Sequence, residues 1–213
     1  MRTDDLVALL AADDRPVATH AVARRLAVAL AWGVPLALLL MVLTQGPRPD
    51  LAQAAQSGMF WWKIVFAGSL ACAAFATVER LARPGVPVGA AWMALATPLI
   101  LVWLAAALVL LQAEPAQRSA LVLGGTWRTC PLNIAWISLP VMTAVVWAMK
   151  GLAPTRLPLA GAAAGLLAGC LGALVYALHC TESAAPFMAI WYVLGISIPA
   201  LVGAVMGSRW LHW

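Results

Sequence analysis

Six apolar stretches, nearly free of charged residues, are the feature that most constrains how this chain can fold. They cover residues 26–43, 60–78, 90–111, 131–149, 157–178 and 187–206. A helix of about 20 residues crosses a hydrocarbon core of about 30 Å, so each stretch is long enough to span a bilayer. The stretches do not alternate between polar and apolar residues as barrel strands do. We therefore predict an all-α fold, a polytopic bundle of six transmembrane helices.

The composition agrees with a membrane protein whose main surroundings are the lipid bilayer. Hydrophobic residues make up 64% of the chain and charged residues only 10%, with a mean hydropathy of +0.92. Soluble domains average about 25% charged residues. We therefore read the basic residues behind the net charge of +5 as indicators of which side of the membrane each segment lies on. We expect no direct contact with nucleic acid.

The basic residues predict the orientation of the bundle. Cytoplasmic segments of membrane proteins are enriched in lysine and arginine. If the N-terminus is inside, nine basic residues lie on the inner face and four on the outer face. The inner set is Arg2, Arg15, Arg24, Arg25, Arg80, Arg83, Lys150, Arg156 and Arg209, and the outer set is Arg48, Lys63, Arg118 and Arg128. We predict that both termini are cytoplasmic.

Residues 1–25 form the one sizeable polar segment, and residues 26–213 form the membrane domain. The segment carries four acids and does not resemble a cleavable signal peptide. Thr3 is suited to cap a helix whose first turn contains Asp4 and Asp5. Apolar residues then follow at helical spacing. About 25 residues cannot bury a core of their own, so we predict either an amphipathic helix at the interface or a docking helix for a soluble partner, formed by Thr3, Asp4, Asp5, Leu6, Leu9 and Leu10.

Chemically reactive residues gather in the stretch His179-Cys180-Thr181-Glu182, at the end of the fifth apolar run. Cys130 ends the preceding hairpin, and the topology places it on the same outer face. In an oxidising compartment two such thiols can form a disulfide. Thiolate and imidazole also suit a soft metal ion such as copper, zinc or cadmium, with Cys130, Cys180 and His179 as ligands. Both possibilities stay open, as does a purely structural role, and no cofactor is obligatory.

Two cations near this stretch are candidate accessory residues. Lys63 follows Phe60-Trp61-Trp62, where a lysine commonly extends to the membrane interface. A functional role would instead pair it with Glu182 or with a carboxylate of a metal site. Arg128 precedes Cys130 by two residues and can lower the pKa of that thiol.

Enzymatic and transport functions receive less support from the sequence. It contains no hydrolytic triad, phosphate-binding loop or zincin motif, and its spans hold no acid away from their ends. Ion-coupled transporters generally need such acids. A membrane thiol–disulfide oxidoreductase is the main alternative, but the chain lacks a C-x-x-C pair. We therefore predict a protein that is not an enzyme, with that oxidoreductase or a small transporter as alternatives.

The chain resembles the NrsF-type anti-sigma factors of proteobacteria. The resemblance rests on Thr3-Asp4-Asp5-Leu6, Phe60-Trp61-Trp62-Lys63, Thr126-Trp127-Arg128-Thr129-Cys130-Pro131, and His179-Cys180-Thr181-Glu182 with Pro186-Phe187 and Trp191-Tyr192. It implies an inner-membrane protein that holds an extracytoplasmic-function sigma factor inactive and releases it under heavy-metal or oxidative stress. The resemblance assigns sensing to Cys130 and Cys180, on the periplasmic side. It assigns no role to His179, Glu182, Lys63 or Arg128, which remain hypotheses drawn from the residues.

Overall fold

A computed structural model describes residues 3–12 and 20–212 of the chain, and all regular structure within them is helical. This confirms the predicted all-α fold. The short helices are α1 (Thr3–Ala12), α3 (Leu51–Ala54), α6 (Pro115–Leu123) and α9 (Ala185–Phe187). The long helices are α2 (Ala21–Thr44), α4 (Gly58–Leu81), α5 (Ala91–Gln112), α7 (Cys130–Lys150), α8 (Leu157–Tyr176) and α10 (Val193–Trp210).

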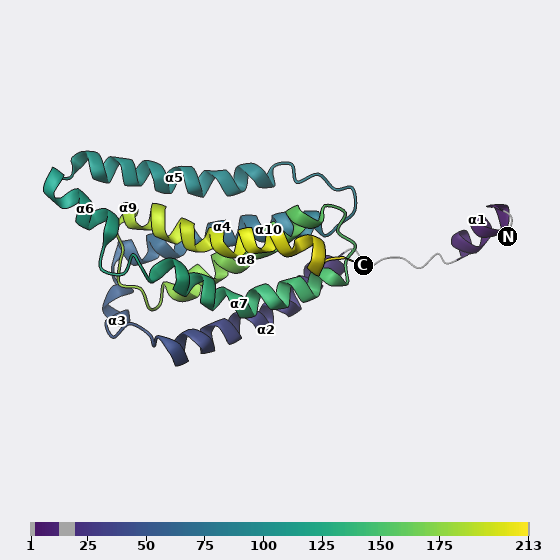
Figure 1. The fold of residues 1–213 in the computed structure, drawn as a ribbon, viewed down its shortest axis with the longest axis horizontal. Helices are drawn as coiled ribbons and strands as arrows, with labels where there is room; N and C mark the ends of the chain where they lie inside the picture. Colours follow the sequence, from purple (N-terminus) through teal and green to yellow (C-terminus); the bar gives the residue numbers. More distant parts are fainter. Residues whose placement is uncertain (1–2, 13–19, 213) are drawn as a thin grey trace.

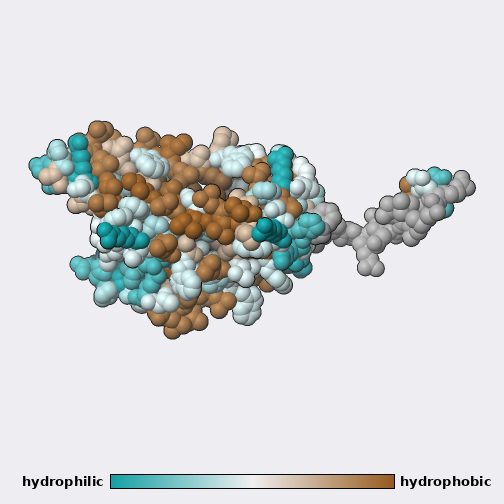
Figure 2. Space-filling model, in the orientation of Figure 1, coloured by the Kyte–Doolittle hydropathy of each residue, from teal (hydrophilic) through white to brown (hydrophobic). Residues whose placement is uncertain are grey.

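Within the described residues, six helical segments are long and apolar enough to cross a membrane. Five of them are α2, α4, α5, α7 and α8. The sixth runs from Ala185 to Trp210, because α9 continues through a π-helical turn (Met188–Tyr192) into α10. Figure 2 shows hydrophobic surface along the middle of the bundle and hydrophilic patches toward its ends. The arrangement is consistent with a membrane protein, and the boundaries lie within a few residues of those predicted.

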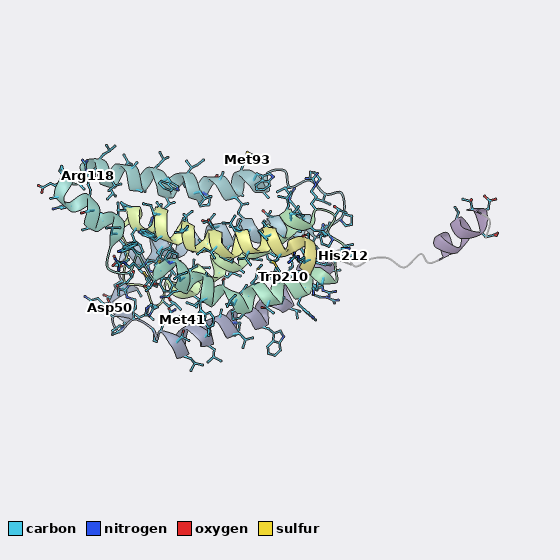
Figure 3. All side chains as sticks on the ribbon, in the orientation of Figure 1. Met41, Asp50, Met93, Arg118, Trp210 and His212 are labelled. Carbon is cyan, nitrogen blue, oxygen red and sulfur yellow. The ribbon has the colours of Figure 1, made fainter. Side chains whose placement is uncertain are left out.

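The helices lie side by side along one axis, so the bundle has two distinct ends (Figure 1). Figure 3 shows Asp50 and Arg118 at one end and Trp210 and His212 at the other. We call the first the cysteine end, because α7 begins there at Cys130 and α8 leads there to Cys180. The second is called the opposite end, where α4, α7 and α10 finish.

Helix α8 occupies the centre of the bundle and packs against α10, α7 and α4. Its contact with α10 depends on glycine. A Cβ atom at Gly161 would overlap the Gly203 carbonyl oxygen, and one at Gly165 would overlap the Pro199 carbonyl oxygen. Small residues at four-residue spacing allow such close backbone approach. Gly161, Gly165 and Gly169 therefore bring the backbone of α8 directly against that of α10.

Helix α1 lies apart from the bundle in Figure 1. The prediction of a helix beginning near Thr3 is confirmed, while the side chains of Leu6, Leu9 and Leu10 lie outside the described part of the structure. Helix α2 begins at Ala21. Residues 21–25 of the expected N-terminal segment are therefore the first turn and a half of the first long helix.

We expect Gly165→Ala to destabilise the bundle by roughly 1–3 kcal/mol, because the added methyl group forces α8 and α10 apart. Reversible unfolding of the purified protein in mixed micelles measures this change. Gly68→Ala is the matched control, since a Cβ at Gly68 meets no other atom within 4 Å. Equal stability of the two variants would contradict the packing described here.

Candidate functional site

The two cysteines singled out by the sequence meet at the cysteine end of the bundle. Cys130 is the first residue of α7, and Cys180 lies in the loop between α8 and α9. The side chains are 0% and 2% exposed, both thiols are free, and they lie within hydrogen-bonding distance of each other. The other two cysteines are placed elsewhere, Cys170 inside α8 and Cys72 on an exposed face of α4.

The loop that carries Cys180 is held by two neighbouring loops. The backbone N–H of Arg48 donates to the Leu178 carbonyl over 3.0 Å. The His179 Nδ1–H donates to the Gly46 carbonyl over 2.7 Å. On the other side, the Glu182 carboxylate accepts the N–H of Gly125, also over 2.7 Å. His179 and Glu182 therefore fix the conformation of the loop around the thiol.

The contact with Glu182 requires glycine in the loop between α6 and α7. Gly124 has a φ of +55°, in the left-handed region that side chains disfavour. A Cβ atom there would also come within 2.8 Å of the Glu182 carboxylate carbon. The same loop is tied to the sixth span, because the Trp191 indole N–H donates to the Val122 carbonyl over 2.8 Å.

Two cations converge on the backbone carbonyl of Cys180. The Lys63 Nζ donates to this oxygen over 3.0 Å, and the Arg48 Nη1 donates to it over 3.4 Å. Lys63 is 0% exposed, and its Nζ lies 5.7 Å from the centre of the Tyr192 ring. The side chain is thus buried beside the thiols and does not extend to the interface. Glu182, the partner considered from the sequence, bonds to Gly125 instead.

Arg48 is itself anchored by a carboxylate. Its Nε and Nη2 donate to the two carboxylate oxygens of Asp50 over 2.7 and 2.6 Å. This bidentate pair lowers the pKa of Asp50 and holds the guanidinium beside the Cys180 loop.

The surroundings of Cys180 favour its thiolate. The Cys130 thiol donates toward the Cys180 sulfur, and the positive charge of Lys63 acts in the same direction. Burial raises the pKa of Cys180, but the effects that lower it are larger, and together they bring this pKa to about 6. The Tyr192 hydroxyl lies beside the sulfur and adds to the effect, although it has no well-formed hydrogen bond within the described structure. Cys180 is therefore the more nucleophilic thiol of the pair.

A cavity of about 230 Å³ borders Cys180 and gives reagents a route to it. Its lining includes Gln45, Arg48, Thr126, Tyr176 and His179, and it does not include Cys130. Small polar molecules can therefore reach Cys180 from this side.

Sequence reasoning missed several residues of this site. Tyr176 and Tyr192 are the two tyrosines of the chain, and both are buried against the cysteine pair. Their positions on either side of the stretch at 179–182 could have indicated this. Arg128, by contrast, is exposed and lies over the Trp127 ring at 5.0 Å. The cations beside the Cys180 segment are Lys63 and Arg48.

The described residues hold no group of three or more histidine, cysteine, aspartate or glutamate side chains arranged to bind a metal ion. The Nδ1 of His179 is directed to Gly46. The donors that the fold brings together are the two sulfurs, and a pair of thiolates is a ligand set that soft metal ions accept.

We expect the alkylation rate of Cys180 to rise as pH increases through about 6 and to level off near neutral pH, because the thiolate is the reacting form. Iodoacetamide labelling of the native protein, followed residue by residue with mass spectrometry, measures this profile. Lys63→Met removes a positive charge and should move the midpoint upward, toward the value of about 8.5 for an ordinary thiol. A midpoint near 8.5 in the unaltered protein would contradict the electrostatics described.

Comparisons with known proteins identify the family. The family model described as "NrsF: Negative regulator of sigma F" matches residues 10–213. A protein of Azospira oryzae described as "Probable anti-sigma-F factor NrsF" is 47% identical over 213 residues, and the "Anti-sigma-F factor NrsF" of Caulobacter vibrioides is 40% identical over 217 residues. Both alignments cover the whole of each chain. No solved structure matches. The chain therefore belongs to the NrsF family of negative regulators of sigma F.

Proposed function

We propose that this protein is an inner-membrane anti-sigma factor that holds an extracytoplasmic-function sigma factor at the cytoplasmic face and releases it when the Cys130–Cys180 pair reacts. The observation that carries the proposal is the contact between two buried free thiols, one at the start of α7 and one in the loop between α8 and α9. Reaction at such a pair changes how α7 and the α8–α9 loop are held together, and these elements belong to the core of the bundle.

The pair can receive a signal in two chemical forms. An oxidant removes two electrons and two protons, and the sulfurs join in a disulfide. Alternatively, a soft ion such as copper, zinc or cadmium displaces the thiol protons and bridges the two sulfurs. Both reactions begin with a thiolate, which the surroundings of Cys180 favour. In either form, Cys180 receives the reagent through the adjacent cavity.

The free energy of such a reaction is large enough to change the state of the protein. Moving an equilibrium from 99% of one state to 99% of the other needs about 5.5 kcal/mol of differential binding. Structural zinc sites with thiolate ligands contribute about 10–16 kcal/mol. A two-sulfur site needs to supply only a fraction of that amount.

The distribution of charge supports an orientation with the cysteine end in the periplasm. The opposite end carries Arg80, Arg83, Lys150, Arg156 and Arg209. Cytoplasmic ends of membrane helices have this excess of basic residues. Both termini then lie in the cytoplasm, and the cysteines lie in an oxidising compartment.

Helix α1 is the segment proposed to dock the sigma factor. It is helical, it lies apart from the bundle, and its Val7 side chain is 61% exposed. A short helix with apolar residues at helical spacing suits a groove on a partner protein. Thr3, Asp4, Asp5, Leu6, Leu9 and Leu10 are the residues proposed to make the contact.

If the cysteine pair senses the signal, the double variant Cys130→Ser, Cys180→Ser should keep its sigma factor bound during exposure to cadmium or a thiol oxidant. Transcription from a promoter that depends on the sigma factor is the measurement, with induction expected to fall to the uninduced level. The control is Cys72→Ser, Cys170→Ser, which removes the other two thiols and should respond normally. Normal induction in the first variant would show that sensing lies elsewhere.

For docking, deletion of residues 2–20 should abolish capture of the sigma factor while the six spans still insert. Co-purification of the sigma factor from solubilised membranes measures capture. A second variant replaces residues 3–12 with a glycine–serine segment of equal length, which preserves the length of the chain. Binding by that second variant would assign the docking surface to the loops at the opposite end.

A further inference from the structure

An open groove runs between α7 and α10 on the outside of the bundle, at the opposite end from the cysteines. Its volume is about 350 Å³, and its walls are mostly apolar. Six of the seven lining residues come from α7, and Trp210 closes the groove from α10. The lining is Leu139, Met142, Thr143, Val146, Trp147, Lys150 and Trp210.

The groove passes from the apolar middle of the bundle to a polar end. Leu139 is 48% exposed on the membrane-facing side of α7, and Trp147 is 62% exposed one turn before the end of the helix. The distance along α7 from Leu139 to Lys150 is about 16 Å at 1.5 Å per residue. This is close to half of a hydrocarbon core of about 30 Å, which is the depth of one leaflet.

Positive charge gathers where the groove reaches the end of α7. Lys150 lines it directly. Arg25 does not line the groove but lies next to it, over the Trp147 ring at 5.6 Å, and it donates to the Gly151 carbonyl. Among residues 20–212, the acid at this end is Glu79, and it is ion-paired with Arg83 on α4. The mouth of the groove is therefore cationic.

We propose that this groove binds an anionic phospholipid, with one acyl chain along α7 and the headgroup phosphate against Lys150 and Arg25. Basic sites between membrane helices recognise anionic headgroups, and tryptophans favour the level of the headgroups in a bilayer. The apolar walls suit a lipid acyl chain, and the cations suit the negative charge of the headgroup phosphate. The length of the groove along α7 is close to the thickness of one leaflet. The bound lipid joins α7 to α10 at the end of α7 remote from Cys130. This site does not depend on the proposed sensing function.

A phospholipid fits the groove better than a second copy of the protein does. The mouth is cationic. A second copy bound here would bring its own positive charges, from the same end of the bundle, to face Lys150 and Arg25. A lipid phosphate supplies the missing negative charge and needs no change in the helices.

Native mass spectrometry of the protein in detergent, titrated with phosphatidylglycerol or phosphatidylcholine, tests the proposal. We expect phosphatidylglycerol to bind at least fivefold more tightly. Lys150→Gln should weaken its binding about fivefold, the effect of losing one basic residue near a phosphate. Thr143→Trp should block binding by filling the groove from its exposed side. Arg118→Gln, at the cysteine end, is the matched control and should bind as the unaltered protein does.

Three results would overturn the proposal. The first is equal affinity for the two lipids, and the second is unchanged phosphatidylglycerol binding in both Lys150→Gln and Thr143→Trp. The third is a dimer in delipidated protein that Thr143→Trp converts to a monomer, which would identify a second copy as the occupant. Unfolding temperatures of each variant without lipid confirm that a loss of binding does not reflect a loss of fold.

Discussion

The close contact between α8 and α10 is the constraint on which the rest of the molecule depends. Their backbones approach until Gly165 lies against the Pro199 carbonyl, which no larger residue allows. The loop from Ala177 to Ala184 leads from α8 into the sixth span, whose later part is α10, and it carries Cys180. The contact therefore constrains both ends of the reactive segment. With its ends fixed, a few hydrogen bonds from Gly46, Arg48 and Gly125 are enough to fix its middle.

A buried cation then determines the chemistry of that segment. Lys63 is enclosed in the bundle, and the group that accepts its ammonium is the Cys180 carbonyl. A charge in such surroundings is costly unless negative charge or oriented dipoles lie near it. Together with the Cys130 thiol, this positive charge lowers the pKa of Cys180, a thiol with almost no exposed surface. Cys130 contributes a proton donor and the second sulfur.

The fold was largely predictable because bilayer thickness sets a strict length for each apolar run. The six spans and their approximate boundaries followed from the lengths of these runs alone. The meeting of Cys130 and Cys180 was inferred from the ends of their spans. The roles of Lys63, His179 and Glu182 were not predictable to the same degree, because they depend on which way side chains turn. Whether Lys63 points to the interface or inward is decided by Tyr192 and the Cys180 carbonyl, which are distant in sequence.

The π-helical turn at Met188–Tyr192 has a consequence for the sixth span. Such a turn accommodates one extra residue, so the residues on its two sides differ in angular register by about 100° from those of an uninterrupted α-helix. Phe187, on one side, remains buried with the loop at the cysteine end, while Gly203, on the other, remains against α8. The two contacts could not both be kept if the extra residue were absent. The span therefore works as two rotationally offset halves, and Tyr192 stands at the junction between them.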